Sequence, residues 1–434
     1  MKIVGGKWSN WSGNVSFRPR HVAVPKAEVE LAATIRQAEG RVRFPGSGHS
    51  FSPLNQTEGT LVDLSAFIGL GGFDPGRETA TIAAATPLWG LGSLLHPLGY
   101  ALKNMGDVDR QTLGGAVATS THGTGRTLGS LSADVASFRL LLATGEVIHC
   151  GPDENPDIYN AGRVSLGLLG VMTEIDMRVR PAYKLQRKYF LHPVNELFRQ
   201  LDGLVNANRH FEFFWFPHSD VVVCKSLNET EAHAPARHSA RTLHARGERR
   251  RAREYVFAGI AEAMRYLPGT AKASHKFLSA FMPRKQKVRW SHEVFPTPRT
   301  IRFTEMEYAV PYAKGAEAVQ ELVEAIRQKK IVTAFPVEFR TVASDDCWLS
   351  PFYGQDSATI GVHQYTKHDA APLFDIAEAI FRNHGGRPHW GKIHNCTRAE
   401  LAALYPRFED FCAVRRKLDP RGKFLNEHLA PLFT

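Results

Sequence analysis

The chain has 434 residues, enough for two domains, and its composition shows none of the bias of disordered or collagen-like proteins. No apolar run approaches the roughly 20 residues of a membrane span, and the polar N-terminus lacks the apolar centre of a signal peptide. The five scattered cysteines form no CxxC pair, which argues against a disulfide framework and a structural zinc site. We therefore expect a cytoplasmic protein with reduced thiols.

The net charge of +11 at pH 7 is concentrated in one stretch. Seven arginines lie between Arg237 and Arg253. This stretch is either a solvated loop and helix face, or a contact surface for a membrane or an acidic partner. Because no aromatic residues are interleaved with the arginines, we do not expect nucleic-acid binding.

Strand and helix patterns alternate over the first 182 residues. One predicted helix follows Thr86 as its N-cap, with Pro87 at its first helical position. A strand over residues 171–181 alternates between apolar and charged side chains and ends at Pro181. The alternation predicts a domain with strands and helices packed on one another.

Glycine-rich loops interrupt this first domain at three places. The segment GSGHS fails the GxGxxG dinucleotide fingerprint, because Phe51 takes the third glycine position and Pro53 prevents the expected helix. What remains is a nest of backbone N–H groups over residues 46–50 that suits a pyrophosphate. The segments GGAVATSTHGTG and SLGLLGV expose backbone in the same way. Three such loops in one domain predict a long, extended ligand, and FAD fits.

From about residue 183 the pattern changes to longer strands and amphipathic helices. This pattern predicts an α+β domain with a mostly antiparallel sheet. The last forty residues read as helical, and we expect them to pack back on the first domain.

These segments closely resemble the sugar-1,4-lactone oxidoreductases of the vanillyl-alcohol-oxidase flavoprotein superfamily, which include L-gulono- and D-arabinono-1,4-lactone oxidases and alditol oxidases. The resemblance covers nearly the whole chain and is strongest to the bacterial gulonolactone type. It rests on these motifs, in the family's order: VRFPGSGHSF, NMGDVDRQTLGGAVATSTHGTG, VSLGLLGVMTEI, FEFFWFP, RFTEMEYAVP, VEFRTVASDD, IGVHQY and RPHWGKIH.

The resemblance implies three parts. These are an FAD-binding domain of the PCMH type over residues 1–182, a cap domain on the substrate side over residues 183–391, and a C-terminal segment over residues 392–434 that completes the first domain. The residues that the resemblance and the loops assign to the cofactor are Pro45, Gly46, Ser47, Gly48, His49, Ser50, Gly106, Asp107, Gly114, Gly115, Thr119, Thr121, His122, Gly123, Gly170, Val171 and Lys392.

Two of these positions carry further implications from the resemblance. His49 matches the histidine that is commonly joined to the flavin 8α-methyl group, which implies covalent FAD. Gly106 matches the small residue that controls oxygen access, where glycine leaves room for dioxygen. The resemblance thus favours an oxidase that forms hydrogen peroxide, with a dehydrogenase that uses another electron acceptor as the alternative.

The expected catalytic residues lie on two strands and one loop. Glu338 and Arg340 are two residues apart, so both leave one face of a strand, where they suit the oxygens of a lactone or polyol. His363 and Tyr365 share a strand face in the same way, and by resemblance this is the substrate side. Lys392 resembles the family lysine near flavin N1, where a cation stabilises charge that appears in the reaction.

Two other constellations are weighed and set aside. Glu305 and Glu307 share a strand face, but they are too close together for a glycosidase pair. His122 has no second or third ligand at metal spacing, so we predict no metal site and assign it to the flavin loop.

The function implied is oxidation of a sugar-1,4-lactone by hydride transfer to flavin N5. Within the same class, the alternative is an alditol oxidase acting on xylitol or sorbitol. From a different class, the alternative is a non-catalytic sugar- or polyanion-binding protein that keeps the fold.

Overall fold

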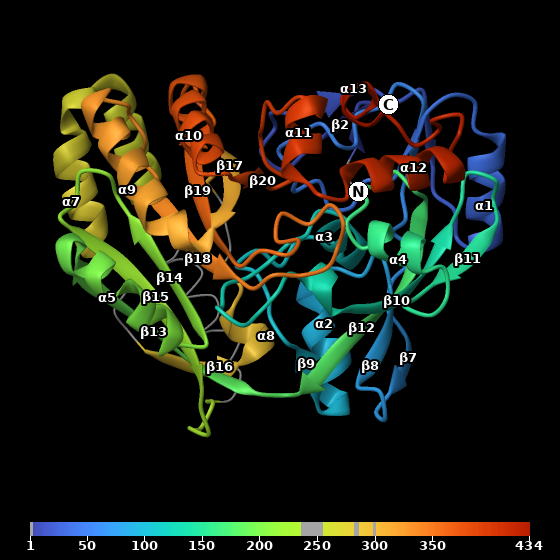
Figure 1. The fold of residues 1–434 in the computed structure, drawn as a ribbon, viewed down its shortest axis with the longest axis horizontal. Helices are drawn as coiled ribbons and strands as arrows, with labels where there is room; N and C mark the ends of the chain where they lie inside the picture. The colour runs from blue at the N-terminus through green and yellow to red at the C-terminus, as the bar shows by residue number, and fades with distance from the viewer. Residues whose placement is uncertain (1–2, 236–254, 282–285, 298–300) are drawn as a thin grey trace.

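A computed structural model describes residues 3–235, 255–281, 286–297 and 301–434, so the arginine-rich stretch lies outside the described residues. Two lobes lie side by side, with a large sheet in one and several smaller sheets in the other (Figure 1). Among the described residues, no helix is both long and apolar enough to cross a membrane.

The N-terminal lobe contains two small sheets and one of six strands. An antiparallel sheet joins β1 (Ile3–Val4), β2 (Lys7–Ser9) and β3 (Ser16–Phe17), and a parallel sheet has the order β4-β6-β5, with β4 (His21–Ala23), β5 (Val42–Arg43) and β6 (Thr60–Val62). The six-stranded sheet has the order β11-β10-β12-β8-β7, and β9 pairs with β12. Its strands are β7 (Leu70–Asp74), β8 (Thr79–Ala83), β9 (Tyr100–Leu102), β10 (Val135–Leu141), β11 (Val147–Cys150) and β12 (Val171–Pro181).

Helices connect and cover these strands. They are α1 (Glu28–Gln37), α2 (Leu88–Leu95), α3 (Leu113–Val117) and α4 (Pro156–Gly162). The predicted N-cap of α2 is wrong by one residue. Pro87 is the capping residue and makes no side-chain cap, because its ring has no polar atom. The Thr86 hydroxyl accepts a hydrogen bond from the Gly69 amide at 2.9 Å.

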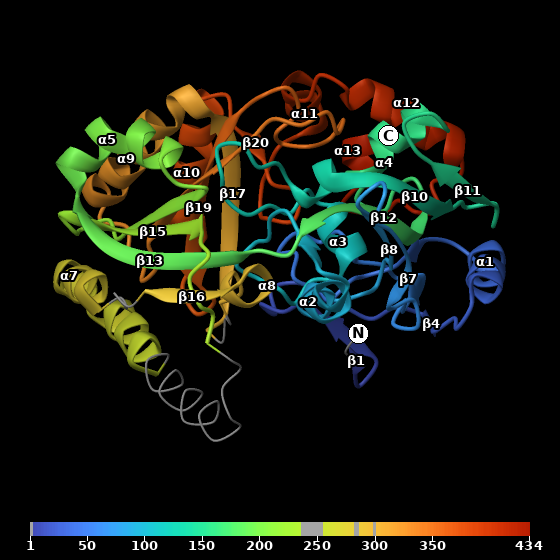
Figure 2. The ribbon, with the colours of Figure 1, turned by 90° about the horizontal axis from the view of Figure 1, so that it is seen from below.

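The second lobe is built on an eight-stranded, wholly antiparallel sheet of order β16-β13-β15-β14-β18-β19-β17-β20. Its strands are β13 (Lys184–Pro193), β14 (His210–Trp215), β15 (Val221–Glu229), β16 (Lys287–Trp290), β17 (Phe303–Pro311), β18 (Val337–Val342), β19 (Ser357–Tyr365) and β20 (Arg387–Pro388). The predicted α+β class with a mostly antiparallel sheet is confirmed. The chain changes sheet between β12 and β13, and Figure 2 shows β13 running along the large sheet.

Three long helices cover one face of this large sheet. They are α5 (Val194–Asn206), α9 (Tyr312–Gln328) and α10 (Ala371–Asn383). The short helix α8 (Ser291–Val294) lies beside β16 (Figure 1), and α7 (Ala271–Phe281) contacts β15. The fit against α9 is tight: a Cβ on Gly315 would lie 2.3 Å from that of Ala358. Because apolar residues such as Phe213 and Phe339 point to the helices and stack there, the alternate residues point to the other lobe.

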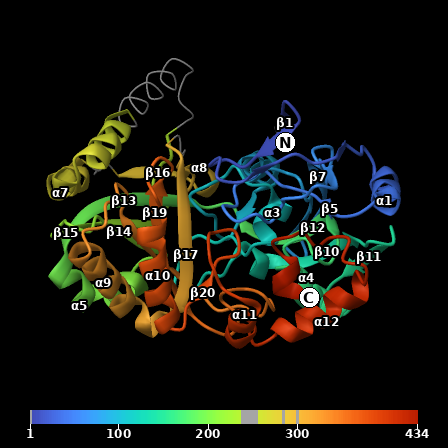
Figure 3. The ribbon, with the colours of Figure 1, turned by 90° about the horizontal axis from the view of Figure 1, so that it is seen from above.

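The C-terminal helices are α11 (Arg398–Leu404), α12 (Phe408–Leu418) and α13 (Ala430–Phe433), and α12 lies beside α4 of the N-terminal lobe (Figure 3). The Asn426 side-chain amide donates to the carbonyls of Pro53, Leu54 and Gln56 at 2.9 to 3.1 Å. The last residues of the chain therefore hold the loop that follows the GSGHS segment.

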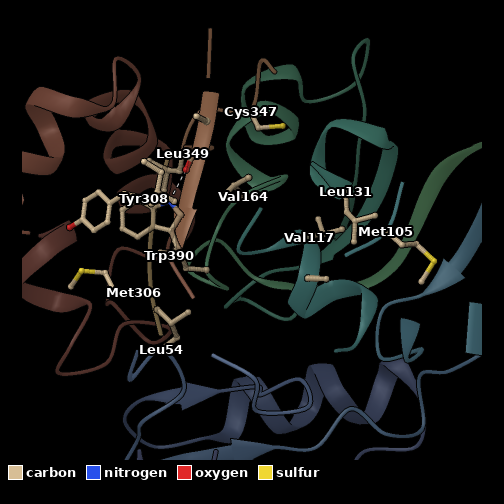
Figure 4. Close-up of a cluster of buried hydrophobic side chains, with 14 of the residues drawn as sticks. Leu54, Met105, Val117, Leu131, Val164, Met306, Tyr308, Cys347, Leu349 and Trp390 are labelled. Carbon is tan, nitrogen blue, oxygen red and sulfur yellow. Dashed lines mark hydrogen bonds between the residues drawn. The ribbon is translucent and has the colours of Figure 1, made fainter. Parts of the chain in front are cut away.

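A buried tryptophan fixes the segment that leads to Lys392. Trp390 is fully buried, and its indole N–H donates to the Leu349 carbonyl at 2.6 Å (Figure 4). The Trp390 carbonyl accepts from the Ser52 hydroxyl at 2.7 Å. This segment and the GSGHS loop are thus held to one another.

Candidate active site

A cavity of about 720 Å³ lies where residues of the two lobes meet. Nearly all the predicted site residues line it. They are Pro45, Gly46, Ser47, Gly48, His49, Ser50, Gly106, Asp107, Gly114, Gly115, Thr119, Thr121, His122, Gly170, Val171, Glu338, Arg340, His363 and Lys392. Gly123 is the exception, because it packs against the Met105 carbonyl, where an added Cβ would come within 2.4 Å.

The GSGHS loop offers unpaired amides to this cavity. Among the hydrogen bonds between described residues, none is donated by a backbone N–H of residues 46–50. The loop is held instead by its carbonyls and flanks: the Trp11 amide donates to the Gly48 carbonyl, and the Phe51 amide donates to the Gly391 carbonyl, both at 2.7 Å. Free, fixed amides suit a phosphate ligand, so the loop fits the pyrophosphate of FAD.

The second glycine-rich segment lies directly against the first. A Cβ on Gly46 would lie 2.5 Å from Thr112 Oγ1, and the Cα of Gly115 is close by at 3.7 Å. Thr112 is the N-cap of α3 and accepts from the Gly115 amide at 3.3 Å. Only a residue without a side chain allows the two loops to approach so closely.

His49 lies at the edge of this loop, with its ring stacked on Trp11 at a centroid distance of 5.8 Å. Burial lowers the pKa of His49 to about 4, and the nearby charges of Lys392 and Arg110 add to the effect. The imidazole is therefore neutral at pH 7 and keeps a free lone pair on one ring nitrogen.

The charged face of the large sheet forms the opposite side of the cavity. The Arg340 guanidinium donates from Nε to Glu212 at 2.7 Å and from Nη2 to Glu338 at 2.5 Å. The carboxylates of Glu338 and Glu307 both flank Gly361 in the strand register. Gly361 has no side chain, so the side chains of Glu307, Glu338 and His363 gather around its position.

Glu305 and Glu307 line the same cavity, which the sequence reasoning missed because it tested them only as a glycosidase pair. Lys392 Nζ lies 2.6 Å from Glu305 Oε2, and His363 Nε2 lies 3.5 Å from Glu305 Oε1. Burial alone raises the pKa of Glu305, but Lys392 and His363 outweigh it, so the carboxylate is ionised at pH 7. Glu305 and Glu307 are two residues apart on one strand, as are Glu338 and Arg340. This spacing was the signal in the sequence from which their place in the cavity could have been predicted.

His122 pairs with the second of these carboxylates. Its Nε2 lies 2.8 Å from Glu307 Oε1, and ligand atoms of His122, Glu307 and His389 lie within 4.8 Å of one another. Sequence spacing gave His122 no second or third ligand, whereas the structure brings Glu307 and His389 beside it from distant segments.

Tyr365, predicted to share the substrate-side face with His363, does not line the cavity. It packs in a separate apolar cluster and donates to Glu262 at 3.1 Å. The end of β19 extends past the cavity, so strand alternation places only His363 inside it.

Comparison with known proteins matches residues 175–432 to the family described as D-arabinono-1,4-lactone oxidase and residues 19–151 to an FAD binding domain. An L-gulono-1,4-lactone dehydrogenase from Mycobacterium tuberculosis is 36% identical over 97% of both chains. An L-gulonolactone oxidase from Bos taurus is 32% identical over 99% of this chain and 98% of its own length. These matches confirm the resemblance and FAD as the cofactor.

Solved structures confirm the fold. A cholesterol oxidase from B. sterolicum superposes with a TM-score of 0.79 over 99% of this chain and 97% of its own, at 18% sequence identity. At this identity the likeness concerns the fold alone.

Proposed function

Because the chain belongs to the D-arabinono-1,4-lactone oxidase family and is an FAD-dependent oxidoreductase, we propose that it oxidises a sugar-1,4-lactone of the L-gulono or D-arabinono type. The observation that carries this proposal is the cavity, in which loops with free amides meet the strand face of Glu338 and Arg340. Free amides suit the FAD pyrophosphate, and a carboxylate beside a guanidinium suits the neighbouring oxygens of a lactone.

The cavity residues divide into two roles in this proposal. Glu338, Arg340 and His363 position the lactone so that the carbon to be oxidised is held in one orientation. Lys392 supplies a fixed positive charge where negative charge develops during the reaction. When bound, FAD supplies the acceptor for the hydride that leaves the lactone carbon.

The electron acceptor in this proposal is dioxygen, with hydrogen peroxide as the product, or another oxidant. Gly106 supports dioxygen, because it lines the cavity and carries no side chain that would obstruct access. Relatives of both kinds occur, since one is named a dehydrogenase and another an oxidase.

Turnover of purified protein on L-gulono-1,4-lactone, D-arabinono-1,4-lactone and xylitol tests the substrate class. We expect turnover on at least one of the two lactones. Activity on xylitol alone would instead support an alditol oxidase, the name of a Streptomyces relative that is 28% identical. Protein that is colourless and takes up no FAD would support a non-catalytic sugar- or polyanion-binding protein.

We also propose that His49 is bonded covalently to FAD. Its neutral imidazole beside the loop with free amides supports this proposal, since a ring nitrogen needs its lone pair to form the bond. Acid denaturation tests it: yellow colour should stay with the wild-type polypeptide and be released from His49→Ala. Complete release of flavin from wild-type protein would contradict the bond.

We further propose a cytoplasmic protein that contacts membrane surfaces through residues 237–253. The five cysteines are buried and free, which suits a reducing compartment. Later in the sequence than the arginine-rich stretch, Tyr266, Leu267 and Phe277 are exposed apolar side chains of the kind that enter a lipid surface. Sedimentation with phosphatidylserine vesicles, and not with phosphatidylcholine vesicles, is the expected result. Equal recovery with both, or with neither, would contradict the contact.

A further inference from the structure

Three adjacent strands of the large sheet carry a row of alternating charges. Glu212 on β14 lies directly opposite Lys225 on β15 in the strand register, and its carboxylate lies 2.5 Å from Lys225 Nζ. On its other side the same carboxylate accepts from Arg340 Nε at 2.7 Å. Glu212 therefore holds a lysine with one oxygen and the substrate-side arginine with the other.

Lys225 reaches across to the N-terminal lobe. Its Nζ donates to Asp107 Oδ1 at 2.7 Å, and Asp107 follows Gly106 in the turn that lines the cavity. The backbone of this turn is also held from the second lobe, because the Thr297 amide donates to the Asp107 carbonyl at 2.9 Å. Lys225 thus connects the turn at Gly106 to the sheet that carries Arg340.

The lysine is fully enclosed, with only 1% of its side chain exposed. Burial alone lowers the pKa of Lys225, but the carboxylates of Asp107 and Glu212 outweigh it and raise that pKa above the ordinary value. Lys225 is therefore charged, and it separates two carboxylates that would otherwise repel each other.

Asp107 is a potential competitor for the arginine. Its Oδ2 already lies 3.8 Å from Arg340 Nη2, which donates to Glu338. Without the lysine, the charge of the Asp107 carboxylate is no longer offset by Lys225, and its attraction for the guanidinium 3.8 Å away would draw Arg340 toward the turn and away from Glu338.

We propose that Lys225 and Glu212 are positioning residues that hold Arg340 in the orientation that binds the lactone, with Lys225 neutralising Asp107 so that it does not displace the guanidinium. This inference rests on the proposed function and adds two residues that touch neither lactone nor cofactor. A purely structural role would destabilise the protein without any specific dependence on Asp107.

The test measures lactone binding to the oxidised holoenzyme by calorimetry, together with kcat and KM, for Lys225→Met, Glu212→Gln and Lys225→Met/Asp107→Asn. Lys225→Met should weaken binding and raise KM about 10- to 100-fold, the range expected for a misplaced binding group. Adding Asp107→Asn should recover most of this loss, because the competing charge is gone. Glu212→Gln should weaken binding in the same direction.

Ser226→Ala is the matched control, since Ser226 is the next buried residue on β15 and points to the opposite sheet face. It should bind lactone like the wild type. Equal lactone binding by wild type and Lys225→Met, or a double variant no better than Lys225→Met, would overturn the inference. If Lys225→Met does not fold, unchanged binding in Glu212→Gln would overturn it instead. Wild-type protein that binds no lactone would contradict the proposed function itself.

Discussion

His122 and Glu307 form a buried pair in which the Nε2 atom of the histidine lies 2.8 Å from a carboxylate oxygen of the glutamate. The other ring nitrogen, Nδ1, lies 2.8 Å from the Gly123 carbonyl. The pair therefore joins the glycine-rich loop to the large sheet.

This pair predicts a pH-dependent loss of stability in Glu307→Gln. Burial alone raises the pKa of Glu307, but His122 outweighs it and holds the pKa well below 4.5. A depressed pKa in the folded state stabilises the protein at pH values above 4.5, and this contribution is lost as the pH falls below 4.5. We expect Glu307→Gln to lower the free energy of unfolding by about 2 kcal/mol at pH 7 and by much less near pH 3.

Urea unfolding between pH 3 and pH 7 measures this difference. Glu324→Gln is the matched control, because the Glu324 side chain is 56% exposed and does not line the cavity. Its effect should stay small at every pH. A loss of stability in Glu307→Gln that is the same at pH 3 and pH 7 would contradict the lowered pKa of the Glu307 carboxyl.

The contact between Lys392 and Glu305 predicts a variant that loses catalytic rate. Lys392→Met removes the cation 2.6 Å from Glu305 and leaves that carboxylate negative in the cavity. We expect kcat for lactone oxidation to fall about 10²-fold or more, with a smaller change in KM, because a charge that stabilises the transition state is lost. Stopped-flow measurement of the reduction rate checks this. Lys103→Met, which removes a lysine paired with Asp134, should leave the rate unchanged.

Strand alternation allowed part of this site to be predicted. Glu338 and Arg340 follow the two-residue period of one strand, and the structure places both in the cavity. The same period applies to Glu212, but it lies within the aromatic run FEFFWFP, which suggests only a core strand. Its role depends on its neighbours Lys225 and Arg340 on the adjacent strands. The sequence of one strand does not show which strands it pairs with or in which register.

The glycine-rich loops could be predicted from the sequence more directly than the strands. Backbone geometry at Gly46 and Gly48 depends on residue type in a direct way, since Gly48 has a φ of +73° that other residues rarely adopt. What the loop sequence does not reveal is the partner that holds it. Gly391 and Asn426 contact this loop from more than 300 residues away along the chain.

The close approach of the two loops predicts that Gly46→Ala impairs FAD uptake. The new methyl group would lie 2.5 Å from Thr112 Oγ1, so the loops must separate and the free amides of residues 46–50 must move. We expect the flavin-to-protein absorbance ratio of purified protein to fall by more than half, while the far-ultraviolet circular dichroism spectrum is kept. Gly72→Ala, which meets its nearest neighbour at 3.6 Å, is the control and should retain full flavin.

The turn at Gly106 predicts a selective effect on the electron acceptor. In Gly106→Ala the new Cβ would lie 3.0 Å from the His122 carbonyl oxygen, a contact that the turn can relieve by a small shift. The protein should therefore fold and reduce a dye at nearly the wild-type rate, whereas the methyl group reduces dioxygen access to the cavity. We expect the rate of peroxide formation to fall about tenfold relative to the rate of dye reduction. A tenfold fall corresponds to an activation barrier raised by about 1.4 kcal/mol. Gly203→Ala, with no atom within 4 Å of the added Cβ, is the control. An equal fall in both rates would indicate a distorted cavity and not a controlled oxygen path.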